Sequence, residues 1–328
     1  MEREYFRNII GNEKIKKIIA HDAPLGRTAH AYIIEGEVGS GRHSIALEIC
    51  ASLVCEHKND SSYPLPCGEC DSCKRILDKI SADVLNLRKL EDKPSIGVDE
   101  IRPIKESLYI APNDGDKKFY IISDADTLTP AAQNALLLPI EEPPEYVTFF
   151  LICENSASLL ETVRSRAPVL RTEKFSSAFI EEYLRSKYKN PDKSKLSYAS
   201  ALSNGAIGRA VQLYENGDSE AKLYRTAETL VELILTAKTS DYLVFIRNNL
   251  PKERADICEI LSLMRNAVRD IIADKKNGEH IFYTEIPEFT KKISVRRSLE
   301  LYTALTQAED DINANCSVNT ILTALIGA

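Results

Sequence analysis

The first half of the chain alternates short apolar runs, rich in β-branched and aromatic residues, with stretches of helical periodicity. Runs of the first kind predict buried strands, and strands that alternate with helices predict a parallel sheet. Five segments fit this pattern: Ala31–Glu35, Asp83–Leu87, Phe119–Ser123, Thr148–Cys153 and Val169–Arg171. The sequence therefore predicts an α/β domain with a parallel sheet over residues 1–172.

After Phe175 the strand pattern stops, and apolar residues recur at helical spacing. Residues 176–215 predict short helices separated by a turn at Gly205–Arg209. Longer helical runs follow, marked by Leu223, Ala227, Leu230, Val231 and Ile234, by Ile257, Leu261, Met264, Val268 and Ile271, and by the tail Ser317–Ala328. We therefore expect a small helical domain over residues 173–215 and an all-helical C-terminal domain over residues 216–328.

A glycine-rich loop follows the first predicted strand and reads Gly36-Glu-Val-Gly-Ser-Gly-Arg-His-Ser44. Gly36, Gly39 and Gly41 keep the frame of a phosphate-binding loop, and the helix predicted from Ser44 to Val54 completes the strand–loop–helix context that such a loop requires. In that motif a lysine reaches the phosphates and the next hydroxyl ligates Mg²⁺. Arg42 and His43 occupy these two positions here. The loop therefore indicates a nucleotide-binding scaffold that no longer uses its nucleotide.

A second altered element is Asp124-Ala125-Asp126, at the end of the third predicted strand. In nucleotide hydrolases of this architecture an Asp-Glu pair here supplies a Mg²⁺ contact and a carboxylate that activates water. Asp124 is retained, whereas Ala125 takes the place of the glutamate. Two aspartates after a strand can also simply cap the next helix. Together with the altered loop, this segment indicates that both hydrolytic elements have lost their chemistry.

Composition and charge restrict the class of protein. A chain of 328 residues accommodates two or three domains, each with its own core. The net charge of -7 argues against coating DNA by bulk electrostatics, although a local basic stripe stays possible. The N-terminus is charged from its second residue, and no run of 18 apolar residues occurs. These features predict a cytoplasmic protein without a secretory signal or a membrane span.

Four of the eight cysteines are grouped, as Cys55 followed by Cys67-Gly-Glu-Cys70-Asp-Ser-Cys73. Four thiolates on a short loop suit tetrahedral Zn²⁺, and a site with four protein ligands is structural because it leaves no open position. Disulfides, which the cytosol disfavours, and an iron–sulfur cluster are the alternatives. The other cysteines stand singly in apolar or helical surroundings and are expected to be small buried hydrophobes: Cys50, Cys153, Cys258 and Cys316.

The pair Ser165-Arg166 lies between the fourth and fifth predicted strands. A lone arginine before a strand is usually a surface residue. An arginine at this place can also project across a subunit boundary onto the γ-phosphate of a neighbour. Such arginine fingers increase the rate of phosphoryl transfer by about 10³–10⁵ where they operate.

Several short motifs occur in a familiar order. They are Ile10-Gly11-Asn12, His30-Ala31-Tyr32, Asn134-Ala135-Leu136-Leu137, Glu141-Glu142-Pro143-Pro144-Glu145 and Ser165-Arg166. With the four-cysteine insert, this sequence resembles the delta-prime subunits of the bacterial DNA polymerase III clamp loader. The resemblance covers residues 6–172 closely and the rest of the chain by its layout.

This resemblance implies an AAA+ parallel-sheet domain (1–172) with a zinc-binding insert (55–73), a helical lid (173–215) and a helical collar (216–328) in a five-subunit assembly. It implies a stator that neither binds nor hydrolyses ATP and has no catalytic activity alone. Arg166, with Ser165, would serve the ATP site of an adjacent motor subunit. The implied partners are motor (gamma/tau-like) and delta-like subunits and, through the assembly, the sliding clamp and primed DNA.

The chain departs from the family pattern at three places. Leu138 stands where a lysine is usual, and Pro139 follows it, so we expect that helix to end or kink early. Ala167 replaces a cysteine after Ser-Arg, a change expected to be neutral. Arg42 and His43 remove the phosphate-loop chemistry, which suits a stator.

Two other functions compete with the stator. The glycines of the loop and Asp124 favour an ATP-hydrolysing motor subunit of the same machine, whereas Arg42, His43 and Ala125 oppose it. A zinc-dependent nucleic-acid-binding protein acting alone is the third possibility. The cysteine loop favours it little, because Glu69 and Asp71 make that loop neutral to acidic and few aromatic residues accompany it.

Overall fold

The computed structural model describes residues 3–23, 28–90, 93–113, 115–236, 239–276, 278, 280, 282–283, 286–314 and 316–327. The chain divides into two compact units, Met1–Glu173 and Lys174–Ala328. Within the described ranges, no helix has both the length and the apolar character needed to span a membrane.

The first unit contains a parallel sheet of five strands. The strands are β1 (Ala31–Glu35), β2 (Val84–Leu87), β3 (Lys118–Ile122), β4 (Val147–Cys153) and β5 (Val169–Arg171), in the spatial order β2-β3-β4-β1-β5. The predicted parallel sheet is confirmed, and each strand lies within one residue of its predicted ends. The carboxyl ends of β1, β3 and β4 meet at one edge, because β4 pairs with both of the others.

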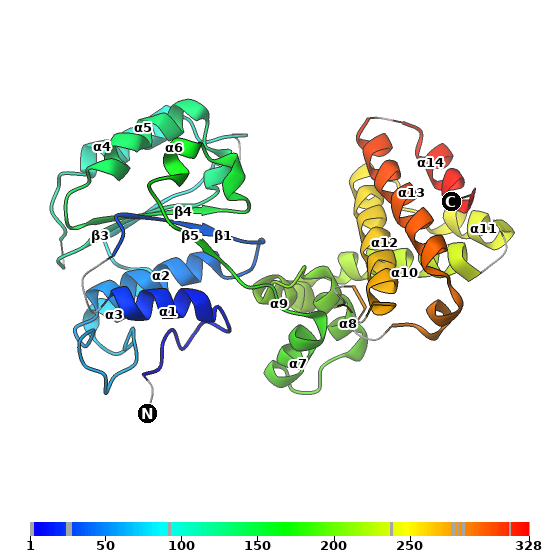
Figure 1. Cartoon of the computed structure of the whole chain (residues 1–328), viewed down its shortest axis with the longest axis horizontal. Helices are drawn as coiled ribbons and strands as arrows, with labels where there is room; N and C mark the ends of the chain where they lie inside the picture. The colour runs from blue at the N-terminus through cyan, green and yellow to red at the C-terminus, as the bar shows by residue number, and fades with distance from the viewer. Residues whose placement is uncertain are drawn as a thin grey trace. The chain divides into compact units, whose positions relative to one another are not determined.

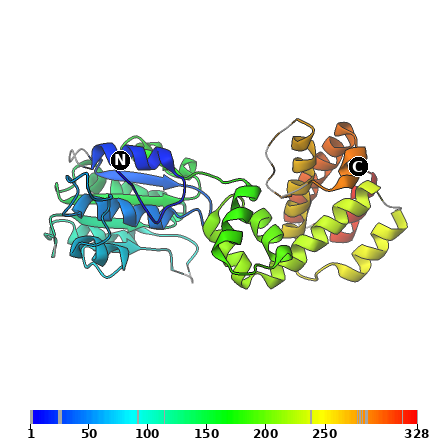
Figure 2. The ribbon, with the colours of Figure 1, turned by 90° about the horizontal axis from the view of Figure 1, so that it is seen from below.

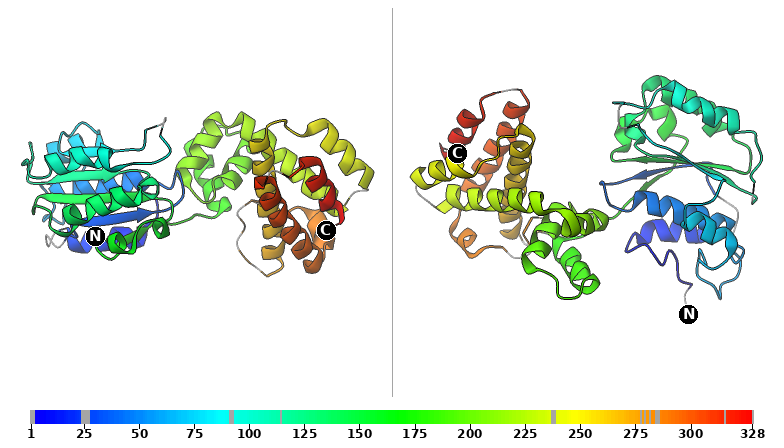
Figure 3. Two further views of the ribbon diagram at one scale, coloured as in Figure 1. Left: turned by 90° about the horizontal axis from the view of Figure 1, so that it is seen from above. Right: turned by 180° about the vertical axis from the view of Figure 1, so that it is seen from behind.

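Helices cover both faces of this sheet (Figure 1 and the right-hand view of Figure 3). One layer holds α1 (Glu13–Asp22), α2 (Arg42–Val54) and α3 (Asp71–Leu77), and the other holds α4 (Val98–Ser107), α5 (Pro130–Glu141) and α6 (Glu161–Arg164). Side chains alternate between the layers along each strand. In β1, Tyr32 and Ile34 join the core under the first layer, whereas Ala31 and Ile33 join the core under the second.

Of the early end or kink predicted at Pro139, the early end is wrong, because α5 continues past this residue. The helix extends to Glu141, and the N–H of Glu142 donates to the carbonyl of Leu138 at 3.1 Å. A proline inside a helix removes one N–H donor. Burial of Pro139 and Ile140 against the sheet side favours continuation of the helix, while Leu138 points outward and is 62% exposed.

The second unit is built from helices, with no strand among its described residues (Figure 2). Its helices are α7 (Ser177–Lys187), α8 (Lys193–Leu202), α9 (Ile207–Asn216), α10 (Asp218–Thr236), α11 (Thr239–Asn249), α12 (Arg254–Asp274), α13 (Val295–Asn313) and α14 (Val318–Ala324). The predicted turn is shorter than expected, because α9 already begins at Ile207. One hydrophobic core extends from α7 to the last helix, so the border between a lid and a collar stays a prediction.

Candidate functional site

The glycine-rich loop joins β1 to the N-terminus of α2, as the strand–loop–helix pattern predicts. Gly39 and Gly41 have φ angles of 80° and 85°, which are strained for residues with a side chain. The N–H of Ser40 donates to the carbonyl of Glu37 at 3.1 Å, and the N–H of Ile45 donates to that of Gly41 at 2.8 Å. The loop therefore keeps a tightly turned backbone directly before α2. The backbone N–H groups at the N-terminus of a helix favour anions.

Gly36 is required for a different reason, which is the packing of Thr172. A Cβ atom at position 36 would lie 1.8 Å from Thr172 Oγ1. Thr172 directly follows β5, and its hydroxyl is hydrogen-bonded to Ser40 Oγ at 3.0 Å. Thr172 thus closes one side of the loop. The sequence analysis missed this residue, because its only signal is its position at the end of the neighbouring strand.

The two residues that depart from the phosphate-loop motif are both partly buried at the start of α2. Burial lowers the pKa of His43, and the charges of Lys79 and Arg88 lower it further. Its buried Nδ1 atom has no hydrogen-bond partner. A neutral imidazole beside cations does not supply the hydroxyl ligand that Mg²⁺ takes in the intact motif.

Cys153 marks the sheet edge where the altered elements meet. It ends β4 and pairs in register with Glu35 of β1. Burial, then the charges of Asp126 and Glu35, raise its pKa to about 12, while Arg42 acts in the opposite direction. Arg42 and Asp126 therefore both lie within electrostatic reach of this thiol. The predicted carboxylate, Asp124, does not contribute to this shift.

Asp124 instead begins a short 3-10 helix, Ala125–Thr127, in a left-handed conformation with φ of 54°. Its backbone carbonyl accepts hydrogen bonds from the N–H and the hydroxyl of Thr127, at 2.8 and 2.7 Å. The carboxylate makes no cap hydrogen bond. Asp124 thus has the position of a cap, but its carbonyl rather than its side chain makes the contact.

Arg166 lies two residues after α6 and pairs with Glu141 at the end of α5. Its Nη1 atom donates to the carbonyl of Thr162 at 2.7 Å and to Ser165 Oγ at 3.2 Å. The two charged side chains are 35% and 38% exposed, so the pair faces solvent. These contacts come from α5 and α6 and none from the glycine loop. Apart from the cysteines, the predicted site residues therefore form two groups: the loop with the β4 edge, and Arg166 with Ser165.

The four grouped cysteines lie together and are buried. Their sulfur atoms all lie within 4.8 Å of one another, and those of Cys67 and Cys73 are 3.9 Å apart. Tetrahedral zinc with Zn–S bonds of about 2.3 Å places its sulfurs roughly 3.8 Å apart. All eight cysteines are free, so no disulfide competes for these thiols. The cluster could hold a metal ion.

Local backbone structure supports this arrangement. Backbone N–H groups of Glu69 and Cys70 donate to Cys67 Sγ at 3.4 and 3.3 Å, and that of Cys73 donates to Cys70 Sγ at 3.5 Å. Burial raises the pKa of Cys67, but the N–H donors of Cys70 and Glu69 outweigh it and lower that pKa overall. N–H donors that favour a thiolate are what a metal ligand needs.

The insert is also held from the N-terminus. Arg3 donates to three of its carbonyls, those of His57, Lys58 and Tyr63, at 2.9, 2.8 and 2.9 Å. Tyr5 forms a parallel bridge with Leu65. The cysteine loop is therefore anchored to the domain even apart from a metal.

Two of the single cysteines differ from the prediction. Cys50 and Cys153 are fully buried, as expected, but Cys258 is only partly buried and Cys316 is exposed. Cys316 lies in the connection between α13 and α14, where its N–H donates to the carbonyl of Asp311 at 3.0 Å. Because Cys316 lies outside both helices, no helix face carries it into the core.

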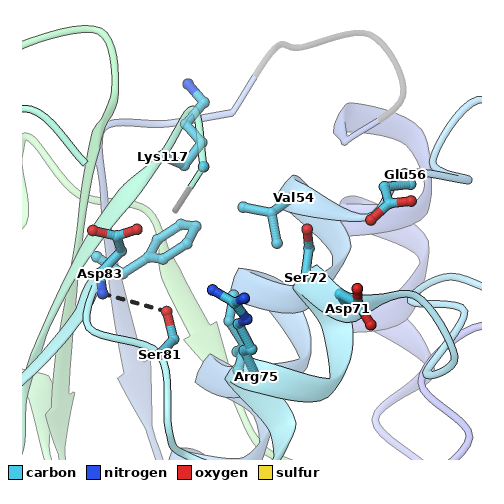
Figure 4. Close-up of a pocket in the computed structure, with 11 residues that line it drawn as sticks. Val54, Glu56, Asp71, Ser72, Arg75, Ser81, Asp83 and Lys117 are labelled. Atoms are coloured by element: carbon cyan, nitrogen blue, oxygen red, sulfur yellow. Dashed lines mark hydrogen bonds between the residues drawn. The ribbon is translucent and has the colours of Figure 1, made fainter. Parts of the chain in front are cut away.

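A cavity of about 270 Å³, whose lining is drawn in Figure 4, includes residues next in the chain to the clustered cysteines. Helix α3, which begins after Cys70 and contains Cys73, contributes Asp71, Ser72 and Arg75 to its wall. The other lining residues include Ser81 and Asp83, which precede β2, and Lys117 before β3. The lining carries both signs of charge, and none of the candidate site residues named from the sequence belongs to it.

Comparison with known proteins gives several matches. The sequence model of the family described as "DNA polymerase III, delta subunit" matches residues 11–176. DNA polymerase III subunit delta' from Bacillus subtilis is 26% identical over 331 residues, covering 95% of this chain and 94% of that protein. Subunit delta' from Yersinia pestis is 37% identical over 141 residues, covering 43% of this chain and 41% of that protein.

Other relatives bear the names of different subunits. Subunit gamma from Buchnera aphidicola (subspecies Schizaphis graminum) is 31% identical over 215 residues, or 64% of this chain, which spans only 58% of that relative. A gamma subunit-related structure from Thermotoga maritima aligns with a TM-score of 0.49 at 18% identity, covering 97% of this chain and 98% of that one. This TM-score is too low to indicate a shared whole-chain fold.

Proposed function

The chain belongs to the DNA polymerase III delta-subunit family, as its motifs predict, and we propose that it is the stator subunit of a clamp loader. A stator of this kind helps to load the sliding clamp onto primed DNA without hydrolysing ATP itself. The observation that carries the proposal is the combination of Arg42, His43 and Ala125 in one chain with an arginine that faces solvent, Arg166.

The proposed loss of ATP hydrolysis follows from the side chains that replace those of an intact phosphate-binding site. A compact lysine ammonium reaches between phosphates, whereas the planar guanidinium of Arg42 is broader and does not substitute simply. His43 offers an imidazole of lowered pKa where Mg²⁺ requires an oxygen. Ala125 has no carboxylate to orient an attacking water. ATP turnover by this chain alone is therefore not expected.

Arg166 retains the chemistry that a neighbouring subunit needs. A guanidinium has five N–H donors and a permanent charge, so it stabilises the charge that develops on a transferred γ-phosphoryl group. Its partners in this chain leave the side chain about one-third exposed. We assign Arg166 the role of a finger acting in trans, with Ser165 supporting one of its nitrogens through the contact at 3.2 Å.

We assign structural Zn²⁺ to Cys55, Cys67, Cys70 and Cys73. The fit rests on four buried sulfurs that all lie within 4.8 Å of one another, with one pair at 3.9 Å, and on N–H donors to two of them. A zinc ion there would supply folding free energy rather than catalysis, because four thiolates leave no coordination position for a substrate.

The remaining parts of the proposal concern the assembly. The first unit would act as an AAA+ module, helices α7 to α9 as a lid, and the remaining helices as a collar. The partners would be gamma/tau-like motor subunits and a delta-like subunit, and the sliding clamp and primed DNA would be reached through them. The proposed location is the cytoplasm.

A motor subunit is the alternative, because relatives named gamma align with up to 65% of the chain. Gly36, Gly39, Gly41 and Asp124 are retained, as a motor would require. Titration of the isolated chain with a fluorescent ATP analogue separates the two functions. The stator predicts no Mg²⁺-dependent binding in the low-micromolar range, and such binding would establish the motor instead.

A further inference from the structure

Arg166 is held by contacts from its own chain that use all three nitrogens of its guanidinium. Its Nε and Nη2 atoms contact Glu141 Oε1, and Nη1 donates both to the carbonyl of Thr162 and to Ser165 Oγ. A guanidinium has five N–H donors and no acceptor. A phosphate that takes two parallel N–H bonds from two nitrogens of Arg166 must therefore displace at least one of these partners.

Glu141 is the charged member of this set of partners. It is the last residue of α5, where the partial negative charge of the helix C-terminus also favours a cation. Arg166 thus lies where two sources of negative charge coincide. Both side chains of the ion pair are about one-third exposed, so the carboxylate and the guanidinium can separate without opening a core.

The edge of the guanidinium that faces Glu141 is the edge that suits a phosphate. Nε and Nη2 form this edge, and two parallel N–H bonds fit a phosphate as they fit a carboxylate. Replacement of Glu141 by a phosphate exchanges one anion for another and leaves the contacts of Nη1 with Thr162 and Ser165 in place. An exposed ion pair contributes little, so the exchange has a small cost.

The exchange depends on the nucleotide that a neighbouring subunit holds. The γ-phosphate of ATP carries more negative charge than a carboxylate and has three acceptor oxygens. ADP has no γ-phosphate, and Glu141 then remains the nearest anion for Arg166. Pairing with Glu141 and pairing with a partner's phosphate are therefore alternatives.

We propose that Glu141 is a resident counter-ion of Arg166 that the γ-phosphate of a neighbouring subunit displaces. Arg166 is paired within its own chain while the neighbour holds ADP, and it is released when the neighbour holds ATP. Glu141 is in this sense a positioning residue, because it acts on the nucleotide only through Arg166. The inference rests on the proposed role of Arg166 as a finger acting in trans, and it adds a dependence on the nucleotide state.

Binding of the full chain to a gamma/tau-like motor subunit tests the exchange, with the motor loaded with a non-hydrolysable ATP analogue or with ADP. Fluorescence anisotropy of the labelled chain measures both affinities. Glu141→Gln should tighten binding to the analogue-loaded motor by about two- to fivefold, because no ion pair has to be broken. Binding to the ADP-loaded motor should not change. High salt, which screens the exposed pair, should reduce the difference between wild type and variant.

Glu142→Gln is the matched control, since Glu142 is an exposed glutamate next to Glu141 and is not among the partners of Arg166. It should change neither affinity. The inference is wrong if Glu141→Gln leaves binding to the analogue-loaded motor unchanged or weakens it. It is also wrong if Glu141→Gln tightens binding equally in both nucleotide states, or if Glu142→Gln has an equal effect.

Arg166→Ala separates failure of the exchange from failure of the proposed function. If Arg166→Ala removes the preference for the analogue-loaded motor while Glu141→Gln has no effect, the exchange alone is contradicted. If Arg166→Ala keeps that preference, the role of Arg166 as a finger is contradicted as well. Circular dichroism verifies that each variant is folded.

Discussion

The guanidinium of Arg166 is paired with the carboxylate of Glu141, although β4 and α6 lie between the two residues in the chain. Glu141 belongs to the Glu-Glu-Pro-Pro motif, and Arg166 to the Ser-Arg motif. Two of the motifs on which the resemblance was based are thus in direct contact. The pair orients Arg166 without burying it, which is what an arginine that must act on another subunit requires.

An exposed ion pair contributes little to folding, so Arg166 should be nearly dispensable for stability. We expect Arg166→Ala and Glu141→Gln each to lower the free energy of unfolding by less than about 1 kcal/mol. Urea denaturation of the isolated chain measures this value. A loss above about 2 kcal/mol in either variant would show that Arg166 serves the fold of its own chain.

Gly36 should tolerate no side chain while Thr172 is present. Because a Cβ atom would lie 1.8 Å from Thr172 Oγ1, Gly36→Ala should destabilise the first unit by about 1–3 kcal/mol. The loss should shrink in a Thr172→Ala background. Gly41→Ala is the matched control, because nothing lies within 4 Å of its added Cβ and only its φ of 85° opposes the change.

Thr172→Ala should therefore not reduce the destabilisation that Gly41→Ala causes. Denaturant unfolding of the three single and two double variants gives both coupling energies. Equal coupling of Thr172 to positions 36 and 41 would contradict the contact.

Removal of one cysteine of the cluster should release the metal. Purified protein should contain one equivalent of zinc, and Cys70→Ser should contain substantially less and unfold at a lower temperature. Cys316→Ser is the control, since that cysteine is exposed and lies outside the cluster. Elemental analysis that finds iron, or no metal, in the wild-type protein would overturn the zinc assignment.

Glu228 should make stability depend on pH. Burial, and then Glu232, raise its pKa above the ordinary value, while Arg225 opposes the shift. A carboxyl group whose pKa is higher in the folded chain destabilises that state once it ionises, so its cost appears as the pH rises through the shifted pKa. Glu228→Gln should therefore be more stable than wild type at pH 7 and equal to it near pH 4. A difference that is constant with pH would contradict this.

The strands could be predicted from the sequence because each buried run is short, apolar and bounded by polar residues, as Ala31–Glu35 and Thr148–Cys153 illustrate. The cysteine cluster could be predicted because its ligands are close in the sequence. Contacts between segments that are far apart in the sequence could not be predicted. Thr172 against Gly36, and Glu141 against Arg166, depend on strand order and helix placement, which local patterns do not encode.

The end of α5 was predicted wrongly for a related reason. Pro139 removes one helical hydrogen bond, but burial of Pro139 and Ile140 in the core under α5 favours two further helical residues.

The ATPase activity of a reconstituted clamp loader tests the central claim most directly. The complex is assembled with wild-type chain, with Arg166→Ala, or with Arg164→Ala, an exposed neighbouring arginine as the matched control. We predict that all three assemble, that Arg164→Ala keeps wild-type turnover, and that Arg166→Ala lowers turnover at the adjacent motor site by about 10³ or more. Unchanged ATPase activity with Arg166→Ala in a fully assembled complex would contradict the assignment of this chain as the subunit that supplies the arginine.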